Sequence, residues 1–375
     1  MKNHIVFIPP SGKFKKQDFS IQRICKWLNR NKNYKTTLLY IKTNGLNIDI
    51  NIFDDIIEVS NTNDILNNLK QLDFDIIFSR SWMHSYSFTK KLVQMFDNVV
   101  VNLKDWNFCS QEEYEFLFDD SSDFEAVEYI FRHSKYVLSH FTYQQTRQWS
   151  SEYNIDENKF IFFPEYCNEE SFVNKELLYE NIKIVYAGRI QPTSYPEELF
   201  PAKSHLRSSK ILTNNKIDVS FVLPEKEYSE VIRRKNEFLD FLYEDKFNTS
   251  FNLVKGEDLN PNILNTYHFG FFELETSGVN KELYKYAVTS KFAFYLEAGL
   301  PILVNNDFIA MADIVSSYNL GIVFCNEDLV NLHNILDISQ GEYNEFLKNI
   351  REYRKEFTYE SQILQFKQFD IFKYQ

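Results

Sequence analysis

Glycine is scarce in this chain of 375 residues, which contains nine glycines. Only Gly12 and Gly45 precede residue 180, and the others lie in the second half of the chain. No G-x-G-x-x-G motif and no phosphate-binding P-loop occurs, which argues against a dinucleotide dehydrogenase and a P-loop kinase. Because glycine lets a ligand approach the backbone closely, we expect a ligand site in the second half.

Metal-binding and disulfide patterns are also lacking. Cys25, Cys109, Cys167 and Cys325 are dispersed without a C-x-x-C pair, so neither a zinc site nor a disulfide framework is indicated. The stretch 73–75, Asp-Phe-Asp, mimics an acidic metal motif but leads into a predicted buried strand with no further ligands nearby. We therefore expect no metal and no bound cofactor.

Long apolar runs and excess positive charge are missing as well. Ile5 to Pro10 is too short for a signal-peptide core, and no later run approaches the ~18 residues of a membrane-spanning helix. The formal net charge of -12 argues against a nucleic-acid partner. We expect a cytoplasmic protein that does not bind nucleic acid.

Although the protein is acidic overall, eight basic residues cluster near the amino terminus, and Asp18 is the one acidic residue among them. Such a cluster could make peripheral contact with an anionic membrane or a lipid-linked acceptor. The alternative is a solvated helix face, which we slightly prefer. The cluster consists of Lys13, Lys15, Lys16, Arg23, Lys26, Arg30, Lys32 and Lys35.

Predicted strands alternate with predicted helices along the chain, which is typical of parallel sheets in an α/β protein. The length exceeds that of one ordinary hydrophobic core and favours two domains. In the first half we predict strands over 4–10, 37–41, 55–59, 74–78 and 98–102. In the second half we predict strands over 183–190, 218–223, 252–255, 269–272 and 301–304.

Residues 280–306 contain the most informative pattern. Ser290 is predicted to cap a helix over 291–298, which Gly299 ends in the left-handed conformation and Pro301 prevents from resuming. The exposed amides at the start of such a helix, together with Lys291, suit a phosphate. An ordinary capped helix in an α/β core is the alternative.

Three segments resemble a known family. SKFAFYLEAGLPILV (290–304), FIAMADIVSSYNLGIVF (308–324) and ISQGEYNEFLKNIREYRKEFT (338–358) resemble GT-B-fold glycosyltransferases, especially the bacterial galactofuranosyltransferase-like and streptococcal glucosyltransferase-like group. The resemblance implies an α/β GT-B fold with two Rossmann-like domains facing across a cleft. The acceptor domain would span 1–175 and the nucleotide-sugar domain 176–358, with a helix over 359–375 returning to the first domain.

The resemblance also implies a donor site in the second domain. The diphosphate would bind at Ser290 and Lys291, with Tyr295 in the same motif. Gly188 and Arg189 would contribute after their strand, and Gly256 and Glu257 would lie near the base. A UDP-linked sugar is the first expectation, and a CMP-linked sugar is the alternative. Lys291 and Arg189 would neutralise the leaving group without a metal.

Two loops in the first half, 79–87 and 103–113, each combine a tryptophan with ionisable side chains. Aromatic faces stack on sugar rings, and carboxylate or imidazole groups can accept a proton from a hydroxyl nucleophile. His84 and Asp105 are therefore the catalytic candidates, although each could be an ordinary loop residue. His133 and His140 are interpreted as structural. The resemblance implies an acceptor hydroxyl on a bacterial surface glycan, glycolipid or glycoprotein.

The sequence departs from the pattern of many retaining relatives, which carry two glutamates eight residues apart. Those positions are Tyr286 and Phe294, so the stereochemistry stays open, and Glu297 is expected to be solvated. The missing glutamates leave two alternatives to a transferase. One is a non-catalytic glycosyltransferase-like accessory or sugar-binding protein, and the other is a nucleotide-sugar epimerase.

Overall fold

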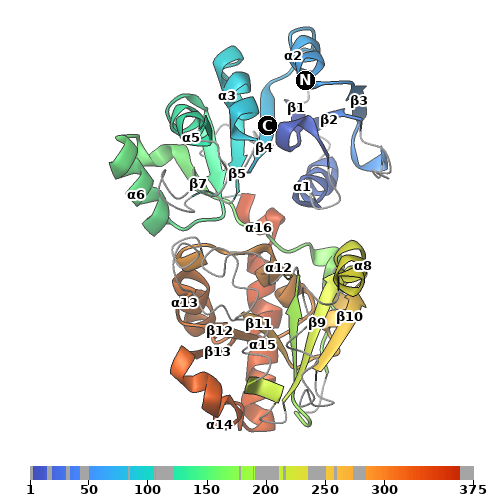
Figure 1. Ribbon diagram of the computed structural model, residues 1–375, viewed down its shortest axis with the longest axis vertical. Helices are drawn as coiled ribbons and strands as arrows, with labels where there is room; N and C mark the ends of the chain where they lie inside the picture. The colour runs from blue at the N-terminus through green and yellow to red at the C-terminus, as the bar shows by residue number, and fades with distance from the viewer. Residues whose placement is uncertain are drawn as a thin grey trace. The chain divides into compact units, whose positions relative to one another are not determined.

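Two parallel β-sheets organise the chain, one in each of two units (Figure 1). The N-terminal unit comprises Met1–Glu165 and Tyr359–Gln375, and the C-terminal unit is Tyr166–Thr358. This confirms the predicted α/β class. The computed structural model describes residues 3–14, 19–30, 34–42, 50–82, 85–104, 106, 122–176, 179–188, 190, 211–213, 217–234, 251–256, 260–272 and 284–363.

The sheet of the N-terminal unit has seven strands in the order β3-β2-β1-β4-β5-β6-β7. Its strands are β1 Asn3–Ile8, β2 Tyr34–Ile41, β3 Asp55–Val59, β4 Ile76–Ser81, β5 Val99–Leu103, β6 Tyr136–Ser139 and β7 Phe160–Phe162. Its α-helices are α1 Phe19–Arg30, α2 Thr62–Leu69, α3 Tyr86–Met95, α5 Ser122–His133, α6 Tyr143–Tyr153 and α16 Tyr359–Ile363. Short 3-10 turns are η1 Pro10–Gly12, η2 Ile50–Ile52, η3 Glu157–Lys159 and η4 Glu169–Ser171, of which η4 belongs to the C-terminal unit.

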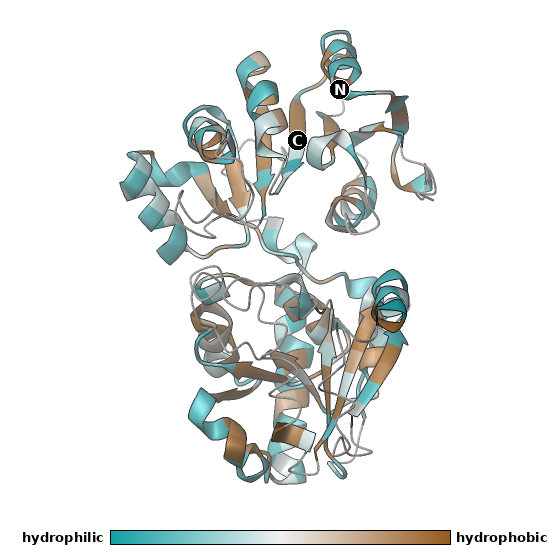
Figure 2. Cartoon of the chain, in the orientation of Figure 1, coloured by the Kyte–Doolittle hydropathy of each residue, from teal (hydrophilic) through white to brown (hydrophobic). Residues whose placement is uncertain are grey.

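Buried parallel strands appear in the sequence as short apolar runs because both faces of the sheet are covered. All five residues of β5 are buried, and hydrophobic residues are prominent along the strands in Figure 2. Local side chains fix the helix ends. The Asn61 side chain accepts a hydrogen bond from the amide of Asp64 at the start of α2, and Asn154 ends α6 with a φ of 50°.

Polar side chains in β4 show which helices cover each face of this sheet. Ser79 and Ser81 lie with their hydroxyl groups 3.4 and 2.9 Å from that of Thr89 in α3. Side chains alternate along a strand, so Arg80 points to the opposite face. That face lies toward α1, which packs against α16.

The sheet of the C-terminal unit has six strands in the order β10-β9-β8-β11-β12-β13. Its strands are β8 Lys183–Ala187, β9 Asp218–Pro224, β10 Phe251–Gly256, β11 Phe269–Phe272, β12 Ile302–Asn305 and β13 Gly321–Phe324. Its helices are α8 Glu225–Arg233, α10 Pro261–Leu264, α12 Ser290–Glu297, α13 Ile309–Ser317, η6 Asn326–Asn331, α14 Leu332–Ile335 and α15 Gln340–Glu356.

The longest helix among the described residues of this unit, α15, begins with a reciprocal cap. The amide of Glu342 donates to the Ser339 hydroxyl at 3.2 Å, and the amide of Ser339 donates to the Glu342 carboxylate at 2.8 Å. From this start the helix buries Tyr343, Phe346 and Leu347 in the core that contains the strands of the sheet. The cap and the apolar face together position α15.

The boundary between the units differs from the predicted boundary at residue 175. Residues 166–175 group with the C-terminal unit because their backbone bonds to it. The Cys167 amide donates to the carbonyl of Phe357 at 2.9 Å, and the Val173 amide donates to that of Glu297 at 2.9 Å. The chain therefore enters the C-terminal unit immediately after Glu165.

Three residues of the basic cluster form ion pairs within the N-terminal unit, whereas Lys15, Lys16 and Lys32 lie outside the described residues. Arg23 lies 3.9 Å from Glu165, Arg30 lies 3.0 Å from Glu360, and Lys35 lies 2.8 Å from Asp55. These carboxylates come from distant parts of the sequence, and they favour the solvated helix face over the membrane contact. No helix in the described part of the chain is long and apolar enough to span a membrane.

Candidate functional site

The helix α12 begins and ends close to its predicted limits, but its cap differs. Thr289, in extended conformation, is the N-cap residue, and Ser290 is the first helical residue. The prediction that Ser290 caps this helix is therefore wrong. Neither side chain makes a capping bond, which leaves the first-turn amides to be satisfied in another way. Gly299, with a φ of 68°, ends the helix as predicted.

Lys291, in the first turn of α12, lies beside the carboxyl end of β8. Its Nζ atom is 4.6 Å from the centroid of the Tyr186 ring, a cation–π contact within the C-terminal unit. The stem of Lys291 occupies the space above Gly188, where an added Cβ would lie 2.6 Å from its Cε atom. Gly188 also has a φ of 141°, which side chains rarely adopt. The structure thus brings Gly188, Ser290 and Lys291 together.

Burial changes the protonation of this pair. Desolvation lowers the pKa of Lys291 to about 8, because the low-dielectric surroundings disfavour the charged form. Burial raises the pKa of Tyr186, so that its ring remains neutral. A lysine with this pKa lies near the midpoint of its titration at mildly alkaline pH, and an anionic ligand beside it would favour the charged form.

Tyr295 occupies the core rather than the surface of this site. It is fully buried, and its hydroxyl accepts from the amide of Ala187 at 3.0 Å. The same hydroxyl lies 3.3 Å from the carbonyls of Val185 and Phe271, so it joins β8 to β11. Tyr295 therefore holds α12, the helix that carries Lys291, against the sheet.

The remaining predicted donor residues are distributed differently. Gly256 ends β10, two strands from β8 at the same edge of the sheet, and an added Cβ there would lie 2.6 Å from Val222. Packing against β9 thus accounts for glycine at this position. Arg189 and Glu257 lie outside the described residues.

The two catalytic candidates in the N-terminal unit, His84 and Asp105, also lie outside the described residues. Described residues at or next to the carboxyl ends of β4 and β5 form a polar group there. Arg80 donates to the Oδ1 atom of Asn102 at 3.5 Å, and its guanidinium lies 6.0 Å from the ring of Trp82. Sequence reasoning missed Arg80 and Asn102, although polar residues near the ends of buried strands were a usable signal.

The expectation that Glu297 is solvated is wrong. The side chain of Glu297 is fully buried. Its carboxylate accepts from the amide of Asn168 at 2.7 Å, and its backbone carbonyl lies 3.3 Å from the Nη1 atom of Arg354. Glu297 thus fastens the segment after residue 165 to α12. Phe294, at one of the missing glutamate positions, is buried in the core.

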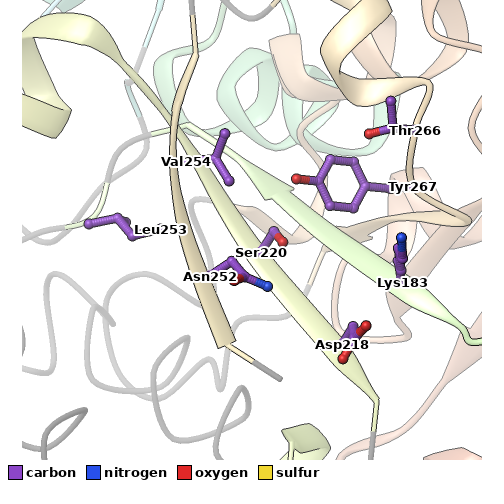
Figure 3. A pocket seen from close by; sticks show the side chains of 8 residues that line it. All are labelled: Lys183, Asp218, Ser220, Asn252, Leu253, Val254, Thr266 and Tyr267. Atoms are coloured by element: carbon purple, nitrogen blue, oxygen red, sulfur yellow. The ribbon is translucent and has the colours of Figure 1, made fainter. Parts of the chain in front are cut away.

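A cavity of about 330 Å³ lies at the end of the C-terminal sheet where the strands begin, away from Lys291 (Figure 3). Lys183 and Asp218 begin their strands there, whereas ligands of open α/β sheets bind at the carboxyl ends. We therefore do not assign the nucleotide to this cavity. Its lining residues are Lys183, Asp218, Ser220, Asn252, Leu253, Val254, Thr266 and Tyr267.

The acidic motif in the first half has a structural explanation. The carboxylate of Asp75 accepts from the backbone amide of His4 at 2.7 Å, and the carbonyl of Asp73 lies 2.6 Å from the His4 ring. Because these contacts use the residues before β4, the strand begins at Ile76 rather than at Phe74. Among the described residues, no group of three or more His, Cys, Asp or Glu side chains could hold a metal ion.

Comparisons with known proteins agree with this architecture. Residues 240–360 match the family described as glucosyltransferase 3-like, C-terminal domain. HepE from Anabaena, solved in complex with UDP-glucose, has 10% identity and a TM-score of 0.65, with 97% of this chain and 98% of HepE covered. Sucrose-phosphate synthase from Thermosynechococcus elongatus has 11% identity and a TM-score of 0.70, with 98% of each chain covered.

A third solved structure is WaaG, a glycosyltransferase involved in lipopolysaccharide biosynthesis. It has 12% identity and a TM-score of 0.57, with 99% of both chains covered. No match to the sequence is found among curated proteins.

The fold is that of the GT-B glycosyltransferases, and the family match in the C-terminal unit agrees with it. Residues 240–360 match the glucosyltransferase 3-like C-terminal domain family. All three segments that carried the resemblance, 290–304, 308–324 and 338–358, lie within the matched residues. The suspected group is therefore confirmed.

Proposed function

We propose that this protein transfers a sugar from a nucleotide-sugar donor to a hydroxyl group of a glycan, glycolipid or glycoprotein of the bacterial surface. The observation that carries the proposal is the position of Lys291. It lies in the first turn of α12, beside Gly188 at the carboxyl edge of the C-terminal sheet. Helix amides and a lysine at such an edge form a site for phosphate.

The chemistry of that site fits the departure of a nucleoside diphosphate. Negative charge grows on the phosphate as the sugar bond breaks, and fixed positive groups stabilise this charge without rearrangement. Lys291 supplies the cation, and the amides of Ser290 and Lys291 supply donors. A protein that neutralises the leaving group in this way has no chemical need for a metal, so we propose metal-independent transfer.

The nucleotide is proposed from the relatives. HepE has been solved with UDP-glucose and with UDP, and the glucosyltransferase 3-like match includes the helix that carries Lys291. We therefore propose a UDP-linked hexose as donor. A CMP-linked sugar is the second candidate, because a single phosphate would also fit the short first turn of α12.

Thermal unfolding with nucleotides in the presence of EDTA tests this function. UDP at about a hundred times its dissociation constant should stabilise the protein by ~2.7 kcal/mol. UDP-glucose incubated with the protein should then release UDP, through slow transfer to water. Stabilisation that requires magnesium or manganese would contradict metal independence. Stabilisation by CMP alone would select the second donor, and no response to either nucleotide would overturn the proposed site.

A further inference from the structure

Asn102 and His140 are among the buried residues of the N-terminal unit whose side chains have a polar atom without a hydrogen-bond partner. The Nδ2 atom of Asn102 and the Nδ1 atom of His140 make no such bond, although the residues are only 1% and 7% exposed. Leaving a buried polar group unpaired costs about 1–3 kcal/mol. Unpaired groups in native proteins therefore often mark a place where a ligand completes the hydrogen bonding.

The structure places the two side chains near each other at the carboxyl edge of the sheet. Asn102 in β5 is the partner of Leu138 in β6, and His140 follows Leu138 by two residues. Because side chains alternate along a strand, Leu138 shares the face of its partner Asn102. His140 directly follows the last strand residue, Ser139, and its ring lies near enough to Arg80 for that charge to act on it. Arg80 in β4 is the register partner of Asn102, so it lies on the same face.

The contacts of Asn102 and His140 determine whether their unpaired nitrogen atoms act as hydrogen-bond donors or acceptors. Arg80 donates to Oδ1 of Asn102 at 3.5 Å, which orients the amide so that its NH2 group remains free as a donor. The backbone of Leu103 lies close to the His140 ring and favours a proton on it, and Nδ1 has no partner, so we assign that proton to Nε2. If Nε2 carries the proton, Nδ1 of the neutral ring presents a lone pair.

Charge around His140 keeps the ring neutral. Burial, with the cations Lys104 and Arg80 nearby, lowers the pKa of His140 well below its usual range. Beside the guanidinium of Arg80, the site thus presents the Asn102 amide as a donor and the His140 ring as an acceptor. A carboxylate or phosphate offers only acceptors and would oppose the lone pair, whereas a hydroxyl group both donates and accepts.

We infer that Asn102 and His140 bind a hydroxyl group of a sugar at the carboxyl edge of the N-terminal sheet. Resting on the proposed function, this sugar is the acceptor of the transfer. Trp82, half-buried just after β4, adds an aromatic ring at the same edge, where a sugar ring can stack. His140, interpreted from sequence as structural, becomes a positioning residue for the ligand.

Ligand-observed NMR with methyl glucoside, methyl galactoside and methyl mannoside tests this inference on the full chain. The wild-type protein should give saturation-transfer signals with at least one of them. His140→Phe and Asn102→Leu should each weaken its binding about five- to tenfold, the loss expected for one hydrogen bond. The control is His133→Phe, since His133 stacks on Tyr129 on the neighbouring helix α5 and should not affect binding.

Stability separates this role from a structural one. Asn102→Leu also removes the acceptor of Arg80 and should lower the melting temperature moderately, whereas His140→Phe should lose glycoside binding with little change in melting temperature. UDP stabilisation should persist in both variants, since UDP tests the proposed donor site separately. Absence of signal in the wild type with all three glycosides would overturn the inference. Equal binding by wild type and variants, or displacement of the glycoside by inorganic phosphate, would do the same.

The imidazole tautomer provides a measurement that does not depend on how the variants fold. A long-range ¹H–¹⁵N spectrum of the wild-type protein should show His140 neutral with its proton on Nε2. The Nδ1 resonance should shift when the bound glycoside is added. A proton on Nδ1, or no shift on addition of the glycoside, would contradict the assignment of Nδ1 as the acceptor.

Discussion

Lys291 rests on the ring of Tyr186, with its Nζ atom 4.6 Å from the ring centroid. The two residues lie 105 positions apart in the sequence, and α12 and β8 bring them together at one edge of the C-terminal sheet. The negative face of the neutral ring holds the ammonium from one side, which leaves the opposite side of the ammonium for an anion. This pairing gives the phosphate site a lysine in a defined position.

Removing the ammonium of Lys291 should reduce turnover more than donor affinity, because the phosphate charge is largest in the transition state. A charge-assisted hydrogen bond contributes ~1.5–3 kcal/mol, which corresponds to a loss of roughly ten- to over a hundredfold in rate. Release of UDP from UDP-glucose measures the effect in Lys291→Ala.

A matched control for this change is Lys285→Ala. Lys285 also lies over a tyrosine ring, with Nζ 5.2 Å from the centroid of Tyr286, but it precedes α12. Its removal should leave the rate unchanged. Wild-type rates in both folded variants would place the phosphate elsewhere.

Donor binding should take up a proton at alkaline pH. The pKa of Lys291 is about 8 in the free protein, and a bound diphosphate raises it. Below pH 8 the lysine is already charged, so this group adds no pH dependence. Above pH 8 binding must protonate it, and UDP affinity should fall toward tenfold per pH unit. Calorimetry at pH 8.5 in two buffers of different ionisation enthalpy measures the proton uptake.

Lys291→Arg is the control for this pH dependence, since guanidinium stays charged throughout the range. Its UDP affinity should be lower than that of the wild type at pH 7.5 yet flat up to pH 9.5. Proton uptake of equal size in Lys291→Arg would assign the titration to another group.

The sequence predicts the strands of the C-terminal unit well because each is a short apolar run bounded by polar or turn residues. Phe269–Phe272 is reproduced at both ends, and the helix before Gly299 is shifted by one residue. Buried parallel strands leave this mark wherever both faces of the sheet are covered. The limits of these elements are therefore properties of local sequence.

Pairings between distant residues could not be predicted in the same way. Arg30 meets Glu360 across 330 positions, and Glu297 is buried because the amide of Asn168 reaches its carboxylate. Local composition made the first a membrane-contact candidate and the second a solvated residue. The partner of Lys291 was missed for the same reason, although its place at the helix start was visible.

Gly188→Ala should displace Lys291. An added Cβ would lie 2.6 Å from the lysine Cε atom, and the backbone φ of 141° would be strained by about 1–3 kcal/mol. We expect lower stability and weaker UDP binding. The control is Gly341→Ala in α15, where the nearest atom to an added Cβ is the Ser339 hydroxyl at 3.6 Å. That change should stabilise the protein by about 0.5–1 kcal/mol in urea unfolding. Unaltered UDP binding in a folded Gly188→Ala variant would contradict the contact.

Lys175 should make the stability of the protein depend on pH. The side chain is only 3% exposed, it donates to the carbonyl of Asn265, and burial lowers its pKa to about 7. In the unfolded chain the pKa returns to about 10.4. Between these values the unfolded state binds more protons, so this group raises the free energy of unfolding as pH increases from 7 to about 10.4.

Lys175→Met removes this titration and should therefore change the slope of stability against pH. Relative to the variant, the wild type should lose on the order of 3 kcal/mol between pH 9.5 and pH 6. The Asn265 carbonyl loses its donor in the variant, which shifts the whole curve without changing its slope. Urea unfolding at several pH values measures the difference, with Lys348→Met, an exposed lysine on α15, as the control. Parallel stability curves for wild type and Lys175→Met would show that Lys175 keeps its ordinary charge in the folded protein.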